Sequence, residues 1–586
     1  MAKRDSAGEI RRSQYIYTYG PGSVINMKID PVTMSFIMGD LRSWEFRSTA
    51  LKRKDEQILT DERIIKELKD NFPGFNAITH FRMPPVDPEE EDTSYLAASI
   101  FPSWLLCPQC RNLYNINDPK QSRDCLREDR SIRRFCNNCS SQKKKVYVVP
   151  SRFVTACKKG HIDNFDYKWW LNTYGEGVDK ECPHYGMKLL QPDGSLSITN
   201  LIIQCSDCKG KAHLGEIFSK DFKCRGARPW KTFEKFAEYE ECGERSKAYQ
   251  RNQRSLWQRI NISALEIPPL DYQFPKKIGP DNYRIIADAS EDKRALLVET
   301  LFERISELWK MNSGSELPYS QDELLEVINS EIKKQGELTS DIFYDEFQVL
   351  TSDNIELIKE FKKVSHSPPP EFRNINSIAE IQKLKVVDAL LGFTRVGGDP
   401  IYFNENTFLP AVAIFGEGFF IDFNLKFINN YLEKLNVKEG FKKFSDDITP
   451  NEKRKIILHS VSHAILKAAA RHAGYSITSI KERLYVNEKM AGILFYTSSS
   501  DCEGTLGGLS RLAEQKRINE IFDEAEKITR ICSNDPLCHE GLYSEQNENN
   551  GSICHSCLIL PETSCDFQNE FLDRSLIEDF WEELKK

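Results

Sequence analysis

The sequence predicts an α+β, multidomain protein with Cys-rich zinc-binding modules, a central helical region and a C-terminal α/β zinc-binding domain. Three observations carry this prediction. The chain has 586 residues, enough for about three or four domains of ordinary size. Its 17 cysteines gather in two stretches, Cys107–Cys242 and Cys502–Cys565, and the 259 residues between the stretches have none. Helical and strand-like hydrophobic patterns fill the remainder of the chain.

Composition and charge limit the function classes. Hydrophobic residues make up 40% and charged residues 29%, as in soluble globular proteins. The net charge of −8 excludes a polybasic tail for nucleic acid but not a local basic face. No run approaches 18 apolar residues, and residues 1–13 lack the apolar core of a signal peptide. We therefore expect a cytoplasmic protein with no membrane partner, whose reduced cysteines bind metal.

The sequence divides into four consecutive parts. Residues 1–100 form an N-terminal region that opens with a Gly/Pro turn. Residues 101–270 form a Cys-rich zinc-binding region with short strand-like runs. Residues 271–385 form a helical region. Residues 386–586 form a C-terminal domain that begins with β-rich segments, including residues 410–423.

Two helices are marked at their ends. Thr449 and Glu452 have the spacing of a capping box around Pro450 at the first helical position, and Gly474 ends the apolar pattern. In the helical region, Ser290 can cap a second helix whose apolar residues recur at helical spacing. We expect the first of these helices to organise the C-terminal domain.

Cysteine pairs at C-x-x-C spacing are the strongest chemical signal. Each pair can place two thiolates on one ion, and two pairs complete the tetrahedral shell that zinc prefers. Two matched pairs predict a first zinc site from Cys107, Cys110, Cys136 and Cys139. One pair and two later cysteines predict a second site from Cys205, Cys208, Cys224 and Cys242. A C-terminal pair and two flanking cysteines predict a third site from Cys538, Cys554, Cys557 and Cys565.

Other residues compete for these ligand positions. Cys157, His161 and Cys182 can supply ligands to the second site, and Cys157 with His161 can instead form half of a separate site. Cys532 is an alternative to one cysteine of the third site. Cys125 has no evident partner and is expected to be buried. Closed four-ligand shells indicate structural zinc, because a catalytic zinc keeps one position open.

Motifs of several enzyme classes are absent from the sequence. It contains no GxxxxGK[ST] phosphate loop, no GxSxG and no HExxH. His459 and His463 lie one turn apart and can bind metal, but their helix is apolar nearly all round, which favours buried, hydrogen-bonded histidines. Residues 504–508 can hold an anion at a helix start, although a tight turn is favoured there. We therefore expect no catalysis; a metal-dependent nuclease is the enzymatic alternative.

Basic and aromatic residues cluster together in the Cys-rich region. Several arginines lie near Trp230 and Trp257. Positive charge suits phosphates and flat rings suit unstacked bases, so the mixture fits DNA contact, although charge runs are more often solvated faces. The candidate DNA-binding residues are Arg225, Arg228, Arg251 and Arg254.

An ordered set of short motifs runs through nearly the whole chain. The motifs occupy residues 10–14, 18–22, 157–161, 229–230, 391–396, 415–418, 458–463, 504–508 and 572–574. In this order they resemble the DrmB family of the bacterial DISARM anti-phage systems. The resemblance implies a C-terminal zinc-binding domain like that at the end of certain superfamily 2 DNA helicases. Its four ligands would fall on Cys538, Cys554, Cys557 and Cys565, with Cys532 in competition with Cys538.

The resemblance also implies partners. In DISARM the helicase-like subunit, DrmA, is a separate chain, which agrees with the missing phosphate loop. The expected function is that of a non-catalytic subunit that partners a DrmA-like helicase and engages phage DNA. A pure assembly scaffold without DNA contact is the second alternative.

Overall fold

The computed structural model describes most of the chain. The described residues are 8–42, 44, 58–72, 74–85, 96–129, 132–191, 197–231, 238–239, 241–267, 273–287, 289–336, 341–352, 355–358, 361–437, 440–441, 444, 448–498, 508–542, 549–561 and 564–586. The glycine-rich segment, for which a tight turn is favoured over anion binding, lies outside them apart from Gly508, as does Cys502. Among the described helices, none is long and apolar enough to span a bilayer.

Contacts divide the chain into two compact units, each built from separate segments. Unit 1 comprises Met1–Thr60, Pro73–Ile262 and Asp388–Val412. Unit 2 comprises Asp61–Phe72, Ser263–Val387 and Ala413–Lys586. The expected division into four consecutive parts therefore differs from the division by contacts, because each unit joins segments that are far apart in the sequence.

Unit 1 includes a three-stranded, a six-stranded and a four-stranded sheet. A three-stranded sheet has the order β1 (Val24–Ile29), β2 (Val32–Met38) and β5 (Ala98–Ile100). A six-stranded sheet has the order β10 (Val149–Pro150), β6 (Trp104–Leu106), β7 (Asn112–Asn115), β13 (Met187–Leu190), β14 (Ile202–Cys205) and β15 (Lys211–His213). A four-stranded sheet has the order β12 (Ile162–Asn164), β11 (Phe153–Cys157), β19 (Arg245–Gln250) and β16 (Asp221–Lys223).

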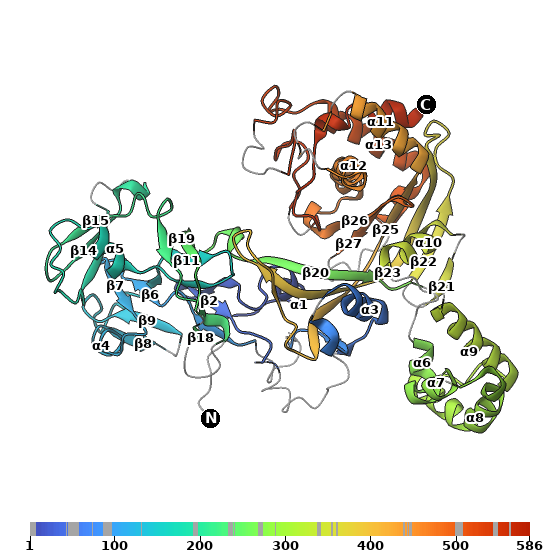
Figure 1. Cartoon of the computed structure of the whole chain (residues 1–586), viewed down its shortest axis with the longest axis horizontal. Helices are drawn as coiled ribbons and strands as arrows, with labels where there is room; N and C mark the ends of the chain where they lie inside the picture. The colour runs from blue at the N-terminus through green and yellow to red at the C-terminus, as the bar shows by residue number, and fades with distance from the viewer. Residues whose placement is uncertain are drawn as a thin grey trace. The chain divides into compact units, whose positions relative to one another are not determined.

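Smaller elements complete unit 1. Two hairpins pair β8 (Leu126–Asp129) with β9 (Arg133–Cys136) and β17 (Ala227–Arg228) with β18 (Glu238–Tyr239). The helices include α1 (Arg12–Tyr17), α4 (Pro119–Asp124) and α5 (Tyr167–Tyr174). Helix α5 packs against β14 and β15 (Figure 1). Its buried Trp170 donates a hydrogen bond to the His213 carbonyl at 2.9 Å, which ties the helix to the edge of the sheet.

Unit 2 is built on an antiparallel sheet. Its order is β21 (Ile355–Ile358), β22 (Phe361–His366), β23 (Ile375–Thr394), β25 (Phe408–Phe423), β27 (Ala491–Thr497) and β26 (Ile480–Val486). The last parts of β23 and the first parts of β25 belong to unit 1, where they pair with β24 (Ile401–Tyr402) and β4 (His80–Arg82). The strand β20 (Gln258–Leu265) also pairs with β23, and β3 (Ile58–Leu59) with β4.

Helix α12 (Pro450–Ala473) is the centre of unit 2. The predicted capping box is present: the Thr449 hydroxyl accepts from the Glu452 N–H at 3.3 Å, and the Glu452 carboxylate accepts from the Thr449 N–H at 2.8 Å. Gly474 ends the helix in the left-handed region, at φ 73°. Residues 456–470 are buried on every face, as expected of a helix apolar all round. The helix therefore lies inside the unit rather than on its surface.

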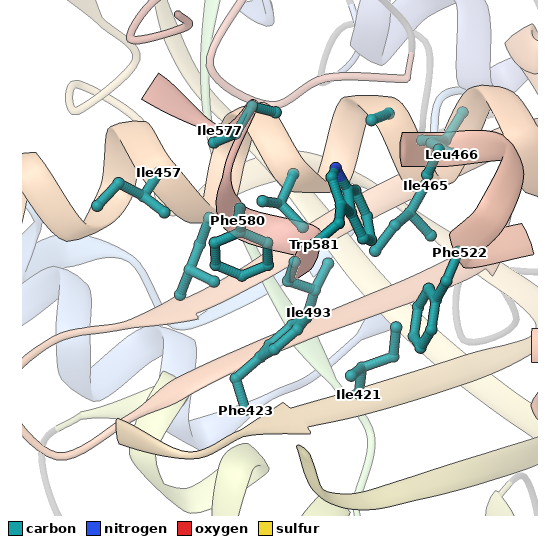
Figure 2. Close-up of a cluster of buried hydrophobic side chains, with 14 of the residues drawn as sticks. Ile421, Phe423, Ile457, Ile465, Leu466, Ile493, Phe522, Ile577, Phe580 and Trp581 are labelled. Atoms are coloured by element: carbon teal, nitrogen blue, oxygen red, sulfur yellow. The ribbon is translucent and has the colours of Figure 1, made fainter. Parts of the chain in front are cut away.

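Other elements of unit 2 enclose α12. They include α11 (Leu425–Val437), α13 (Gln515–Arg530) and α14 (Phe580–Lys585). Figure 2 shows Phe580 and Trp581 of α14 between α12 and the sheet, where they meet Ile493 of β27. Since large aromatic side chains dominate core energetics, the C-terminal residues stabilise the same core as the central helix.

The predicted helical region is only partly helical. Its helices are α6 (Gln273–Ile278), α7 (Pro280–Ala287), α8 (Glu291–Ser313), α9 (Gln321–Gly336) and α10 (Ile342–Thr351), and α3 (Glu62–Asn71) joins the unit from earlier in the chain. From Ile355 onward the chain forms strands instead. Ser290 lies at the N-cap of α8, as predicted, but its side chain makes no capping hydrogen bond.

Candidate metal centres

The first cluster lies at the ends of neighbouring strands in unit 1. The four cysteines predicted for the first zinc site lie together, with sulfur atoms within 4.8 Å of one another. Cys107 and Cys110 occupy the turn between β6 and β7, and Cys136 ends β9. The Tyr114 hydroxyl approaches the Cys136 sulfur at 3.2 Å and the Cys110 sulfur at 3.8 Å. A compact set of four sulfur donors fits zinc.

The predicted second site is wrong as a group, because its two halves lie in different clusters. Cys224 and Cys242 join Cys157 and His161 in the second cluster. Cys205 and its pair partner lie elsewhere. The registers of the strands explain this separation. Strand β19 pairs with both β16 and β11, with Arg245 opposite Lys223 and Ser246 opposite Cys157. Cys157, Cys224 and Cys242 therefore meet at the same end of the four-stranded sheet.

The second cluster has three sulfurs and one imidazole. The His161 Nδ1 lies 3.4 Å from the Cys157 sulfur and 3.6 Å from the Cys224 sulfur. All four residues are buried. The structure therefore agrees with the alternative in which Cys157 and His161 form half of a separate site.

The third cluster comprises Cys182, His184, Cys205 and Cys208. Strand β13 pairs antiparallel with β14 so that Met187 faces Cys205, which brings the residues before β13 to the end of β14. The Cys182 and Cys205 sulfurs are 3.8 Å apart. The His184 Nε2 lies 2.8 Å from the Asn172 side-chain oxygen, which leaves Nδ1 as an acceptor 3.7 Å from the Cys208 sulfur. This orientation suits a metal ligand held by an outer partner.

The sequence reasoning missed His184, although a signal for it was present. The Cys-Pro-His triplet at residues 182–184 offers two ligand types at short spacing. His184 has a positive φ of 48°, which is uncommon for residues other than glycine and shows a backbone shaped around this turn. Cys125, the residue without an evident partner, lies outside every cluster found among the described residues.

A buried arginine supports the second cluster. Arg395 is fully buried and donates hydrogen bonds to the carbonyls of Gly160, at 2.8 Å, of Gly22, at 3.0 Å, and of Leu256. Its guanidinium lies 5.1 Å from the centre of the Trp230 ring. Burial lowers its pKa to about 9. Gly22, Gly160, Trp230 and Arg395 itself belong to four of the ordered sequence motifs, which therefore meet at one side chain. The motif that contains Gly160 also carries His161.

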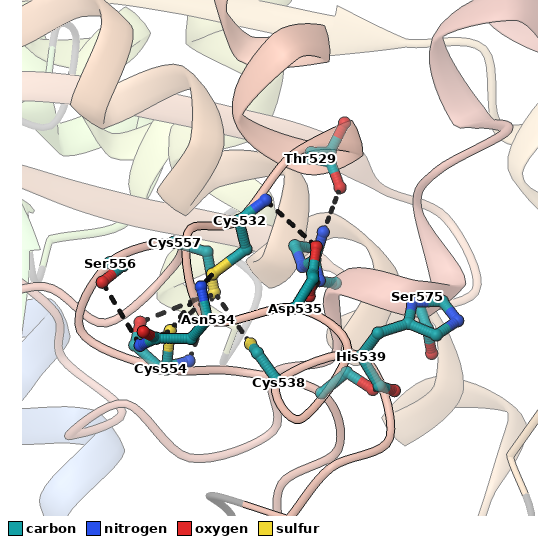
Figure 3. A network of polar contacts seen from close by, with 12 residues as sticks. Thr529, Cys532, Asn534, Asp535, Cys538, His539, Cys554, Ser556, Cys557 and Ser575 are labelled. Atoms are coloured by element: carbon teal, nitrogen blue, oxygen red, sulfur yellow. Dashed lines mark hydrogen bonds and ion pairs between the residues drawn. The ribbon is translucent and has the colours of Figure 1, made fainter.

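The fourth cluster lies in unit 2, and its membership corrects the predicted third site. Cys532 takes the place expected for Cys565 and lies with Cys538, Cys554 and Cys557 (Figure 3). The sulfurs of Cys532 and Cys554 are 3.4 Å apart. Those of Cys538 and Cys557 are 3.7 Å apart. Cys565 lies instead beside His459 of α12, with 3.2 Å between its sulfur and Nε2.

Polar residues fix the loops of the fourth cluster. Arg574 pairs with Asp535 and donates to the Thr529 carbonyl at 3.0 Å, while the Asp535 carboxylate accepts from the Cys532 N–H at 3.1 Å (Figure 3). Lys467 of α12 donates to the Cys557 carbonyl. The helix and the C-terminal residues therefore hold the cysteine loops in place.

Electrostatics differ among the cysteines. Burial raises the pKa of the Cys205 and Cys557 thiols to about 11. At Cys554, burial also raises the pKa, but hydrogen bonds from Asn534 and Cys532 outweigh it and lower the pKa to about 6. Thiolates are the metal-binding form, so the lowered pKa of Cys554 favours its role as a ligand. The 16 described cysteines form no disulfides with one another.

The four predicted DNA-binding arginines occupy different environments. Arg225 is half-exposed and bonds to Asp163 at 2.7 Å. Arg251 donates to the carbonyls of Pro150 and Ser151, at 3.0 and 2.7 Å. The four residues fall into two classes, with Arg225 and Arg254 exposed and Arg228 and Arg251 partly buried.

The aromatic rings near these arginines are packed inside unit 1. Trp230 is 2% exposed. Trp257 donates from its indole N–H to the Pro21 carbonyl at 3.0 Å and stacks on Phe393. Trp230 is therefore unavailable for base stacking, whereas Trp257 is half-buried and is covered by Phe393 on one side.

Comparisons with known proteins bear on these clusters. Residues 11–258 match the model of a domain of unknown function, DUF8724, and residues 461–558 match the MrfA Zn-binding domain. The DISARM protein DrmB of Bacillus paralicheniformis is 27% identical over 94% of this chain and 97% of its own length. The crystal structure of the DUF1998 helicase MrfA bound to DNA shares 10% identity at a TM-score of 0.20. That match covers 39% of this chain and 26% of the MrfA chain.

These findings confirm the resemblance that the ordered motifs predicted. The chain is similar to the DISARM protein DrmB along nearly its whole length and carries an MrfA Zn-binding domain. That domain includes all four cysteines of the fourth cluster. The cysteine clusters and the domain match both fit zinc as the bound metal.

Proposed function

We propose that this chain is a non-catalytic subunit of a DISARM-type anti-phage complex in the bacterial cytoplasm, where it partners a DrmA-like helicase and contacts phage DNA. The observation that carries the proposal is the similarity to DrmB over 94% of the chain. A likeness that spans both chains almost end to end reflects the same arrangement of parts rather than one shared module.

The four clusters described above act as structural zinc sites in this proposal. Each supplies four ligand atoms from buried or partly buried residues. A complete shell of protein ligands leaves no position for a substrate or an activated water. Metal binding then contributes folding free energy to loops that have little regular structure.

The proposed helicase partner rests on the match to the MrfA Zn-binding domain and on the lack of an ATP-binding loop in this sequence. Residues 461–558 match a domain named for MrfA, and the solved MrfA structure is a helicase bound to DNA. The 586 residues here contain no GxxxxGK[ST] loop and so lack that ATP-binding lysine. A helicase-type appendage that lacks this motor signature would act on a motor in another chain.

DNA contact is proposed for the exposed basic residues of unit 1. Lys223 of β16 and Arg245 of β19 are exposed and directly opposite each other. Like charges in this position repel, and a DNA phosphate between them would remove that cost. Arg254 and Arg225 are exposed in the same unit, whereas the backbone bonds of Arg251 give it a structural role first.

DNA binding by the reconstituted complex tests this surface. The double variant Lys223→Glu/Arg245→Glu should weaken DNA binding at least tenfold and reduce the slope of log affinity against log salt by about 0.9, since one phosphate contact is lost. The control Lys426→Glu/Lys516→Glu makes the same charge change at exposed positions of unit 2. Equal DNA affinity of both double variants and the parent would contradict DNA contact through this surface and would favour a scaffold role instead.

A further inference from the structure

We propose that unit 2 binds one more divalent metal ion, zinc by its donor set, through His459, His463, Glu482 and Cys565. The proposal goes beyond the function above and does not depend on it. The residues come from three places: α12 supplies both histidines, β26 supplies the carboxylate, and the C-terminal loop supplies the thiol. Two of them, His459 and Cys565, lie outside the matched Zn-binding domain.

The four ligand atoms converge on one point. The His459 Nε2 lies 2.9 Å from Glu482 Oε1 and 3.2 Å from the Cys565 sulfur. The His463 Nε2 lies 3.1 Å from the same Oε1. All four ligand atoms are within 4.8 Å of one another. A tetrahedral zinc with bonds of about 2.0–2.3 Å holds its ligands roughly 3.3–3.8 Å apart, inside this span.

The hydrogen-bond geometry of His463 points to a cation in the middle. Its Nδ1 lies 2.7 Å from the Leu558 carbonyl oxygen, which can only accept, so Nδ1 carries the proton. In the neutral ring, Nε2 then directs a lone pair at the carboxylate of Glu482. Two acceptors at 3.1 Å repel each other unless a cation lies between them. A proton can bridge two of these atoms, whereas a metal ion satisfies all four.

The burial of the Glu482 carboxylate also indicates a cation at this site. His459 and His463 have no exposed surface, and Glu482 is 1% exposed. A carboxylate removed from water is costly unless it is paired or bound to metal. The nearby Lys455 is directed over the Phe567 ring, 3.4 Å from its centroid. A divalent ion among the four donors would balance both the carboxylate and the thiolate.

Outer hydrogen bonds orient the ligands, as they do around most metal sites. The Cys565 sulfur accepts from the Asn569 N–H at 3.3 Å. The Ser462 hydroxyl lies against Glu482 Oε2 and leaves Oε1 directed at the histidines. The Nδ1 of His459 is buried without a hydrogen-bond partner in the described part of the chain, so this ring is oriented through Nε2.

The site is structural rather than catalytic, because four buried ligands leave no access for a substrate. Its effect is to tie the C-terminal loop to α12 and β26. The loop is also held by the Glu482 N–H, which donates to the Ser564 carbonyl at 3.2 Å. The site contacts the fourth cluster through His463 and Leu558, the residue that follows Cys557.

Metal counting on the full-length protein tests the proposal. Native mass spectrometry of protein purified without chelators should show that Cys565→Ser and Glu482→Gln each carry one metal ion fewer than the parent chain. The matched control Cys125→Ser removes a thiol outside every described cluster and should keep the parent count. A folded Cys565→Ser or Glu482→Gln protein with the full count would overturn the proposal.

X-ray absorption at the zinc edge covers the case in which these variants fail to fold, because it uses the unaltered chain. With this site filled beside the four other clusters, 15 sulfur and five nitrogen or oxygen ligands surround the metal ions, a ratio of three to one. Without it, 14 sulfur and two nitrogen ligands give seven to one. A ratio near three supports the proposal, and a ratio near seven overturns it.

Discussion

Two groups of metal-ligand residues in unit 2 are assembled in opposite ways. The fourth cluster takes its cysteines from loops within residues 532–557, and two of them form a C-x-x-C pair. The group around His459 joins a helix, a strand and a loop, and His459 is 106 residues from Cys565. The first type is visible in the sequence because its spacing is local. Of the second, the sequence shows only the spacing of His459 and His463, and Glu482 and Cys565 join them only when the fold is known.

Helix α12 serves both groups. Its two histidines belong to one, and its Lys467 donates to the Cys557 carbonyl of the other. In unit 1 the comparable support is Arg395, whose three carbonyl partners include the loop of the second cluster. Each unit thus holds one of its cysteine loops with a fully or nearly buried cationic side chain.

The largest expected effect is the loss of the fourth cluster. Cys554→Ser should release its metal ion and unfold the surrounding loops, because structural zinc contributes roughly 10–16 kcal/mol in finger peptides. Limited proteolysis and zinc content would show the change, with Cys125→Ser as the control. Parent-like zinc content and protease resistance in Cys554→Ser would contradict a structural zinc there.

Ligand pairing in unit 1 is the next test. Cys208→Ser and Cys224→Ser should each lose one metal ion, and their double variant should lose two, because the structure places them in separate clusters. Cys182→Ser/Cys208→Ser should lose only one. Metal analysis of the four proteins decides the matter, and a loss of one ion from Cys208→Ser/Cys224→Ser would restore the grouping expected from the sequence.

The third effect is the loss of stability expected when Arg395 is replaced. Arg395→Ala should destabilise unit 1 by about 3 kcal/mol, because buried carbonyls lose hydrogen bonds to a charged donor. Urea denaturation followed by tryptophan fluorescence would measure it. Arg395→Lys should recover only part of the loss, since an ammonium lacks the planar fork that reaches three carbonyls. No loss of stability in Arg395→Ala would show that the arginine does not support the cluster.

The smallest effect concerns the start of α12. Thr449→Ala removes the capping hydroxyl and should cost about 1 kcal/mol. Because the cap precedes the nearest ligand, His459, by ten residues of helix, about 15 Å at 1.5 Å per residue, zinc content should stay at the parent value. Thermal unfolding and metal analysis measured together would show this, and a loss of zinc would mean that the helix start controls the sites directly.

These cases show what could be predicted from the sequence. The capping box of α12 and the four cysteines of the first cluster depend on local spacing, and the structure has both. The partners of Cys205 depend on the register of β13 and β14, which C-x-x-C spacing does not contain. Likewise, Trp230 is adjacent to arginines in sequence but packs inward, because tertiary contacts decide the direction of a side chain.

The central claim is that this chain acts as a subunit beside a separate helicase. The most direct test is co-expression with the DrmA-like helicase of the same bacterium, followed by affinity purification and size-exclusion chromatography at moderate salt. We expect one peak that contains both chains and that binds DNA more tightly than the helicase alone. Separate elution of the two chains, or DNA affinity unchanged by this chain, would contradict the account.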